Sequence, residues 1–305
     1  MSVLSQPTRW RLPKVRRREW QGLLYISPWL IGFAIFTVYP FFWSIQLSFM
    51  DWKGIGEPDF LGFANYTRMF TDDEAFIFSI RNTIVYTLVH VPGIMILAFA
   101  VALLLNERVR FMPIFRTLFY LPSVTSWVAT VVLWVWILHP TGLLNQGLAT
   151  LGITGPNWFG STTWALPGLI LMSFWNIGST MVIYLAGLQG VPQQLYDAAE
   201  IDGANSWQRV RYVTIPMMTP SIFLTLILGV IGSFQVFTAA LVATEGGPGY
   251  ATTFVLLHLY FNAFRYFRMG YASAIGWVLF VIIMFFTILQ FWLASRWVYY
   301  EGEAQ

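Results

Sequence analysis

Long apolar runs separated by short polar segments dominate the chain. The apolar stretches lie at 23–49, 80–105, 114–138, 164–188, 216–242 and 271–295. A helix needs roughly 20 mostly apolar residues to cross the hydrocarbon of a bilayer, so each of the six stretches is long enough to span it. They lack the regular alternation of strands in an outer-membrane barrel. The pattern predicts an all-α membrane protein with six transmembrane helices, in which the prolines inside these stretches are accommodated by neighbouring helices.

A polar segment at 192–216 separates the fourth and fifth apolar stretches. Pro192 can open a short helix at its first position, where the missing N–H is not needed. Gly203 is suited to a left-handed helix stop, and Ser206 can cap a second helix that starts at Trp207. The segment predicts a helix–turn–helix finger that protrudes from the membrane.

This segment resembles the EAA loop of binding-protein-dependent ABC importer permeases, whose pattern is Glu-Ala-Ala, three residues, Gly, nine residues, then Ile-x-Leu-Pro. The matching positions are Asp197, Ala198, Ala199, Gly203, Val213, Ile215 and Pro216. Asp197, Val213 and Ile215 depart from the pattern but keep its charge or apolar character. The resemblance implies that the loop docks on an ATPase subunit. The coupling residues it implies are Asp197, Ala198, Ala199, Glu200, Gly203 and Pro216. An amphipathic loop lying on lipid headgroups is the alternative.

Four further elements, in the same order as in the family, extend the resemblance over nearly the whole chain. They are Gly62–Tyr66, Phe115–Pro122, Thr244–Gly249 and Gly270–Ala274. Together they are most similar to the carbohydrate branch of the family, the maltose, lactose and glycerol-3-phosphate type. The resemblance implies a type-1 ABC importer permease fold in the inner membrane of a bacterial or archaeal cell.

Composition and charge agree with a membrane protein and give it an orientation. The chain is 57% hydrophobic and 10% charged, with a mean hydropathy of +0.63. Basic residues concentrate before the first stretch, after the second, in 192–216 and after the last, and cytoplasmic loops carry such an excess. We therefore expect both termini and the finger to be cytoplasmic. The net charge of +3 reflects this topology and gives no reason to expect nucleic-acid binding.

The chain divides into four regions by the same pattern. Residues 1–21 form a basic cytoplasmic tail, 22–79 the first transmembrane helix with an outer loop, 80–295 the permease core, and 296–305 a cytoplasmic C-terminal tail. The core would hold five transmembrane helices and the EAA loop.

The chain lacks the motifs of nucleotide and metal chemistry. Its only lysines, Lys14 and Lys53, stand outside any phosphate-binding glycine loop. The histidines, His90, His139 and His258, show no metal-ligand spacing, and there are no cysteines. We therefore expect a non-catalytic subunit without a cofactor of its own. The resemblance implies that ATP and Mg²⁺ are bound by a partner ATPase.

Polar side chains inside the fourth and fifth stretches are candidates for a solute path, because such residues usually face a bundle interior or a watered cavity. The candidates are Ser173, Asn176, Ser179, Thr180, Ser233 and Gln235. In the family, the sugar contacts align near Asn176, Ser179, Ser233 and Val236. Hydroxyl and amide groups among aromatics suit a neutral sugar. The alternative is that these groups join helices through hydrogen bonds.

The resemblance also implies an assembly. It consists of a second homologous permease, two ATPase subunits and an extracytoplasmic solute-binding protein, with sugar as solute and membrane lipid around the spans. A glycerol-3-phosphate or phosphodiester importer of the same fold is an alternative. An ion-coupled secondary transporter would need charged groups inside the spans, and Arg81 at a helix start is the only candidate.

Overall fold

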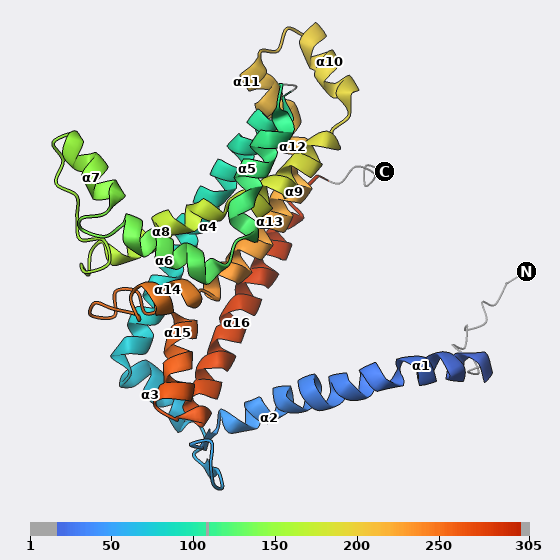
Figure 1. The fold of residues 1–305 in the computed structure, drawn as a ribbon. Coiled ribbons are helices and arrows are strands. Elements are labelled where there is room, and N and C mark those ends of the chain that lie inside the picture. Colours follow the sequence, from blue (N-terminus) through green and yellow to red (C-terminus); the bar gives the residue numbers. More distant parts are fainter. Residues whose placement is uncertain (1–16, 108–109, 300–305) are drawn as a thin grey trace, which may run out of the picture.

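The computed structural model describes residues 17–107 and 110–299, which are mostly helical (Figure 1). The part of the chain it describes has two short strands, β1 (Met50–Asp51) and β2 (Asp59–Phe60), which pair antiparallel with Met50 opposite Phe60. Residues 1–16, which hold most of the expected basic tail, lie outside the described ranges. The last residues expected in that tail, from Arg17, are already helical.

Three helices are long and apolar enough to cross a membrane without interruption. The first runs through α1 (Arg17–Phe33), the π-helix η1 (Ala34–Val38) and α2 (Tyr39–Leu47). The other two are α4 (Glu74–Asn106) and α16 (Met269–Ala294). Pro92 lies within α4 without ending it.

Three further spans are broken and bent. The chain bends by 98° between α5 (Met112–Val124) and α6 (Trp127–Ile137). It bends by 45° between α8 (Ala165–Ser173), which is continued by the 3₁₀ turn η2 (Phe174–Asn176), and α9 (Gly178–Gln189). It bends by 67° between the segment from α11 (Ser206–Arg209) to α12 (Ile215–Met217) and α13 (Thr219–Phe234). Counting each bent pair as one span gives up to six.

The fifth span differs in extent from the apolar stretch 216–242. Helix α13 ends at Phe234, and the short helix α14 (Thr238–Ala243) follows after a break. Hydropathy does not reveal this break because both sides of it are apolar. Proline contributes to the bend before α13, since Pro216 and Pro220 each stand in a first helical turn, where a missing N–H is tolerated.

The bundle is centred on α4, which packs against α9 and α13, while α13 also packs against α16 (Figure 1). Close approach depends on glycine at two positions. A side chain at Gly93 would meet the Phe174 ring, and one at Gly178 would lie 2.8 Å from the Phe119 carbonyl oxygen. Helices α4, α5 and α9 therefore pack around the break at η2.

The first span extends away from this bundle (Figure 1). None of the residues 22–46 is buried, and the span meets the bundle only where α2 packs against α16. Its apolar surface, including Tyr25 and Phe36, is exposed in the isolated chain.

The loop after the first span is anchored by residues of the sequence element Gly62–Tyr66. Asn65, in α3 (Ala64–Thr71), donates hydrogen bonds to the carbonyls of Ser48 and Met50, at 2.9 and 3.0 Å. The Tyr66 hydroxyl donates to the Ser48 hydroxyl at 2.8 Å. These bonds hold the end of α2 and the β-hairpin to α3.

A carboxylate at the start of α4 joins three helices. Asp73 caps α4 by accepting from the Phe76 N–H. Its other oxygen lies 2.8 Å from Nε2 of His258, in α15 (Val255–Tyr260), and accepts from the Tyr271 hydroxyl of α16 at 2.5 Å. Asn262, in the π-helix η4 (Phe261–Arg265), lies 3.2 Å from the same histidine nitrogen.

The charge of Asp73 is strongly favoured in this setting. Burial raises the pKa of the Asp73 carboxyl, but the hydrogen bonds from His258 and Tyr271 and the attraction to His258 outweigh it and lower the pKa to about 2. The pKa is thus lower in the folded chain than in the unfolded one. The carboxylate stabilises the fold above about pH 4, and this contribution is lost as the pH falls from about 4 to about 2.

We expect Asp73→Asn to destabilise the protein by about 2 kcal/mol near neutral pH, because it removes this charge but keeps a side chain that can cap α4. Thermal unfolding in detergent, followed for both proteins at pH 6 and pH 3, measures the difference. The wild type should lose about half of its advantage at the lower pH. An advantage of the same size at both values would contradict the assignment.

Candidate coupling and solute sites

A finger formed by α10 (Gln193–Ile201), the turn at 202–205 and α11 stands at one end of the molecule, opposite α3 (Figure 1). Pro192 is its N-cap, not its first helical residue as expected from the sequence, so the helix begins at Gln193, one position later. No residue of α10 is buried, and Ile201 is 87% exposed. The structure thus confirms a protruding helix–turn–helix element.

The spacing between Ala199 and Gly203 is explained by the turn that ends α10. Gly203 has φ +78°, and its N–H bonds to the Glu200 carbonyl at 3.0 Å. The Ala204 N–H bonds to the Ala199 carbonyl at 2.9 Å. This pair of bonds is the Schellman arrangement, which pairs otherwise free carbonyls at a helix end. The left-handed stop expected at Gly203 is confirmed.

The second helix of the finger is capped by Asn205, so the expectation that Ser206 would cap it is wrong. The Asn205 side chain accepts from the Gln208 N–H at 2.9 Å, and the Gln208 side chain accepts from the Asn205 N–H at 2.7 Å. This reciprocal capping box pairs two backbone N–H groups, those of Asn205 and Gln208. A cap at Ser206 would leave the backbone N–H of Asn205 without a partner. The helix consequently begins at Ser206, one residue before the start at Trp207 that the sequence predicts.

Side-chain contacts link α10 to the segment that continues into the membrane. The Tyr196 hydroxyl lies 3.0 Å from that of Thr214, at the end of the π-helix η3 (Val210–Thr214). Glu200 and Arg209 form an exposed ion pair at 3.5 Å. Pro216 follows η3 in α12, just before the 67° bend. The finger is therefore one unit joined to α13 through a bend.

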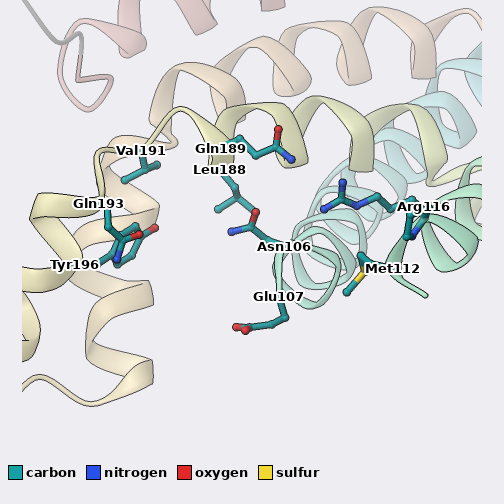
Figure 2. Close-up of a pocket in the computed structure, with 10 residues that line it drawn as sticks. Asn106, Glu107, Met112, Arg116, Leu188, Gln189, Val191, Gln193 and Tyr196 are labelled. Carbon is teal, nitrogen blue, oxygen red and sulfur yellow. The ribbon is translucent and has the colours of Figure 1, made fainter. Parts of the chain in front are cut away.

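A cavity of about 540 Å³ separates the base of the finger from the adjacent ends of the bundle. Figure 2 shows Gln193 and Tyr196 on the finger side and Asn106, Glu107 and Arg116 on the bundle side. The Arg116 guanidinium donates to the Leu105 carbonyl at 2.9 Å, close to the C-terminus of α4. The cavity thus lies between the base of the finger and α5.

The first solute-path candidate is engaged within the protein. Ser173 is buried, and its hydroxyl donates to the Ile170 carbonyl at 2.6 Å and lies 2.7 Å from Nδ1 of His90. The His90 ring stacks between Tyr86 and Phe174. These contacts fix the start of η2, where α8 ends.

The other candidates lie beside the two helix breaks and differ in their surroundings. Two have a buried polar atom with no hydrogen-bond partner among the described residues, Oδ1 of Asn176 and Oγ of Ser233. The remaining candidates are exposed or half-buried: Ser179, Thr180, Gln235 and Val236. Phe174 from one break and Val236 from the other pack against one buried cluster, so the two breaks are neighbours.

Sequence reasoning missed one member of this region. Nε1 of Trp134, in α6, is buried without a partner among the described residues, and its ring meets that of Trp175 at 5.8 Å. Trp134 stands in the uniformly apolar run Val131–Ile137, where nothing separates it from its neighbour Trp136.

No group of three or more His, Asp or Glu residues that could hold a metal ion occurs within 17–107 and 110–299. The arrangement of broken spans around a bundle, with a polar finger at one end, defines the membrane-embedded subunit of a transporter.

The chain belongs to the family of binding-protein-dependent transport system inner membrane components, whose model matches residues 94–299. It is 40% identical to the probable ABC transporter permease protein YesP of Bacillus subtilis over 295 residues, 95% of this chain and 96% of that protein. It is 33% identical to the lactose transport system permease protein LacF of Rhizobium radiobacter, over 90% of this chain and 94% of that protein.

A solved bacterial ABC transporter involved in the import of the acidic polysaccharide alginate has a chain of the same fold. The TM-score is 0.80 at 24% identity, covering 92% of this chain and 96% of that chain. The resemblance stated from the sequence and the type-1 importer permease fold are confirmed. The protein is a multi-pass, non-catalytic permease subunit of the inner membrane.

The conformation of Gly203 gives a direct test of the finger. Gly203→Val should cost about 1–2 kcal/mol, because a β-branched residue is strained at positive φ, whereas Gly203→Asn should be tolerated. Opening of the turn should then be roughly five- to thirtyfold more frequent in the valine variant. Limited trypsin cleavage after Arg209 in detergent measures it, with cleavage after Arg265 as internal control. Equal rates for both variants would refute the role of the turn.

Proposed function

We propose that this chain is a permease subunit of an ATP-driven sugar importer and that it couples to a separate ATPase through the finger. The observation that carries the proposal is the finger itself, whose helix α10 has no buried residue although its C-terminal end is tightly capped. A rigid, exposed element of this kind is suited to the cleft of another protein. The docking surface consists of Asp197, Ala198, Ala199, Glu200 and Gly203.

Closure of the ATPase would reach the membrane through Pro216. The contacts of Tyr196 and Glu200 make α10 move with η3, and the bend after Pro216 joins that unit to α13. Because α13 packs along α4 and α9, a displacement of the finger tilts the centre of the bundle. ATP and Mg²⁺ are bound by the partner ATPase subunits.

The exposed first span supports a second permease as partner. Its apolar residues 22–46 are unburied, and it projects beyond the bundle, where a homologous membrane subunit would pack against it. Two permeases would then enclose one pathway. On the outer side, a cavity of about 840 Å³ lined by Arg68, Glu245 and Tyr250 offers mixed charge to a solute-binding protein.

The solute is a sugar, as in the lactose system of the relative LacF. The pathway runs past the breaks at η2 and at 235–237. The buried, unpartnered oxygens of Asn176 and Ser233 are the acceptors that sugar hydroxyls would satisfy there. Ser173 acts indirectly, since its hydroxyl is held by His90 and Ile170. Ser179, Thr180, Gln235 and Val236 complete the proposed path.

The orientation can be tested because the chain contains no cysteine. Ile55 and Ile201 are 91% and 87% exposed at opposite ends of the molecule. In cells that express the subunit without its partners, a membrane-impermeant maleimide should label Ile55→Cys directly. Ile201→Cys should react only after the membrane is opened. Labelling of Ile201→Cys in intact cells would place the finger outside and refute the coupling proposal.

The function is tested by uptake in a strain carrying this permease with its partner permease, ATPase and binding protein. Lactose, maltose and trehalose form the sugar panel, and glycerol phosphodiesters form the comparison. We expect ATP-dependent uptake of a sugar that Gly203→Val abolishes, while the isolated ATPase keeps its activity. Uptake of phosphodiesters alone would favour the glycerol-3-phosphate alternative. Uptake that needs an ion gradient and no ATPase would refute the proposal.

A further inference from the structure

Three breaks interrupt the helices, and helices beside them pack together, α5 against α9 and α6 against α14. The breaks lie between α5 and α6, between α8 and α9, and between α13 and α14. The first two are in contact, since a side chain at Gly178 would lie 2.9 Å from Oγ of Ser123. Trp134 of α6 packs against the same cluster as Val236 and Phe237 of the third break. Membrane transporters place solute sites where such interrupted helices meet.

Each of the three broken spans carries a buried side-chain atom that has no partner in the described part of the chain. Among the described residues, the buried side-chain atoms without a hydrogen-bond partner are Arg116 Nε, Trp134 Nε1, Asn176 Oδ1, Ser233 Oγ and Gln290 Oε1. Three of them, on Trp134, Asn176 and Ser233, come from the three broken spans. A buried polar group left unpaired costs about 1–3 kcal/mol, so each of the three calls for a partner. They supply one donor and two acceptors.

The two tryptophans near these atoms stand at an angle to each other. The rings of Trp134 and Trp175 have centroids 5.8 Å apart and an interplanar angle of 72°. Trp175 is 47% exposed and precedes Asn176 in η2. Two aromatic faces meeting in this way, with polar atoms on the same elements, match a pyranose ring, which has apolar C–H faces and hydroxyls at its edge.

We propose that Trp134 is a sugar-contacting, specificity-determining residue. Its Nε1–H donates to one hydroxyl of the sugar ring, which packs in the corner between Trp134 and Trp175. Asn176 Oδ1 accepts from a second hydroxyl. This rests on the proposed function, and it adds α6 to the two helices that already line the path. Alternating access brings the solute to this corner.

The contact is tested with Trp134→Phe, which keeps an aromatic ring and removes the donor. Trp136→Phe is the matched control, because Trp136 lies on the same helix and is 61% exposed. Uptake is measured for the disaccharide of the lactose, maltose and trehalose panel that the wild type carries, and for its monodeoxy analogues. All variants use the same binding protein and ATPase, so the selectivity of the binding protein cancels in the comparison with wild type.

We expect Trp134→Phe to lower uptake of the parent sugar by roughly three- to tenfold, the effect of one lost hydrogen bond. One deoxy analogue, which lacks the bonded hydroxyl, should be carried equally by the variant and the wild type. Trp136→Phe should change nothing. A loss of the same size for the parent and every analogue would show a structural role and overturn the inference, as would unchanged uptake.

Failure of the proposed function gives a different result. If the wild type itself carries none of the panel sugars, the sugar importer proposal falls, and this inference falls with it. If the wild type carries a sugar and Trp134→Phe shows no analogue-dependent effect, only the role of Trp134 is refuted.

Discussion

In hydrocarbon, a backbone N–H or C=O has no water to bind, so each interruption of a membrane helix must lie where protein covers it. This constraint governs the permease, because three of its six candidate spans are broken. The breaks are brought together by positions where a side chain would collide. Gly178 allows α9 to reach the Phe119 carbonyl, and Gly93 leaves room for the Phe174 ring. The breaks at η2 and between α5 and α6 are thus covered by neighbouring helices.

The two ends of the bundle are held in different ways. At the outer end, side chains far apart in sequence are bonded, as in the joining of Asp73 to His258 and Tyr271. Asn82 of α4 likewise donates to the carbonyls of Tyr250 and Thr253. At the finger end, caps bond neighbouring residues of α10 and α11, the Tyr196 and Thr214 hydroxyls join α10 to η3, and a cavity lies beside the base of the finger. The finger is therefore held by contacts within its own segment and with the segment that follows it.

Features of the fold that depend on neighbouring residues were predictable from the sequence. Features that depend on contacts between distant segments were not. Apolar length gave the spans, and glycine at a helix end gave the turn at Gly203, since both depend on neighbours in sequence. The choice of Asn205 over Ser206 as cap depended on which residue could pair with Gln208. The pairing of Asp73 with His258 crosses 185 positions, and no local pattern indicates it. The break after Phe234 was likewise not predictable, because the sequence is apolar on both sides of it.

The main ambiguity left by the sequence was whether polar groups in the spans join helices or meet solute. The structure divides them by whether their bonds are already made. The hydroxyls of Tyr184 and Thr225 lie 2.7 Å apart and join α9 to α13, and Ser173 bonds to its own helix and to His90. Asn176 and Ser233 retain unpaired oxygens. A group that already has its partner gains little from a sugar hydroxyl, whereas an unpaired one gains the bond and loses its burial penalty. The proposed sugar path therefore relies on that second set.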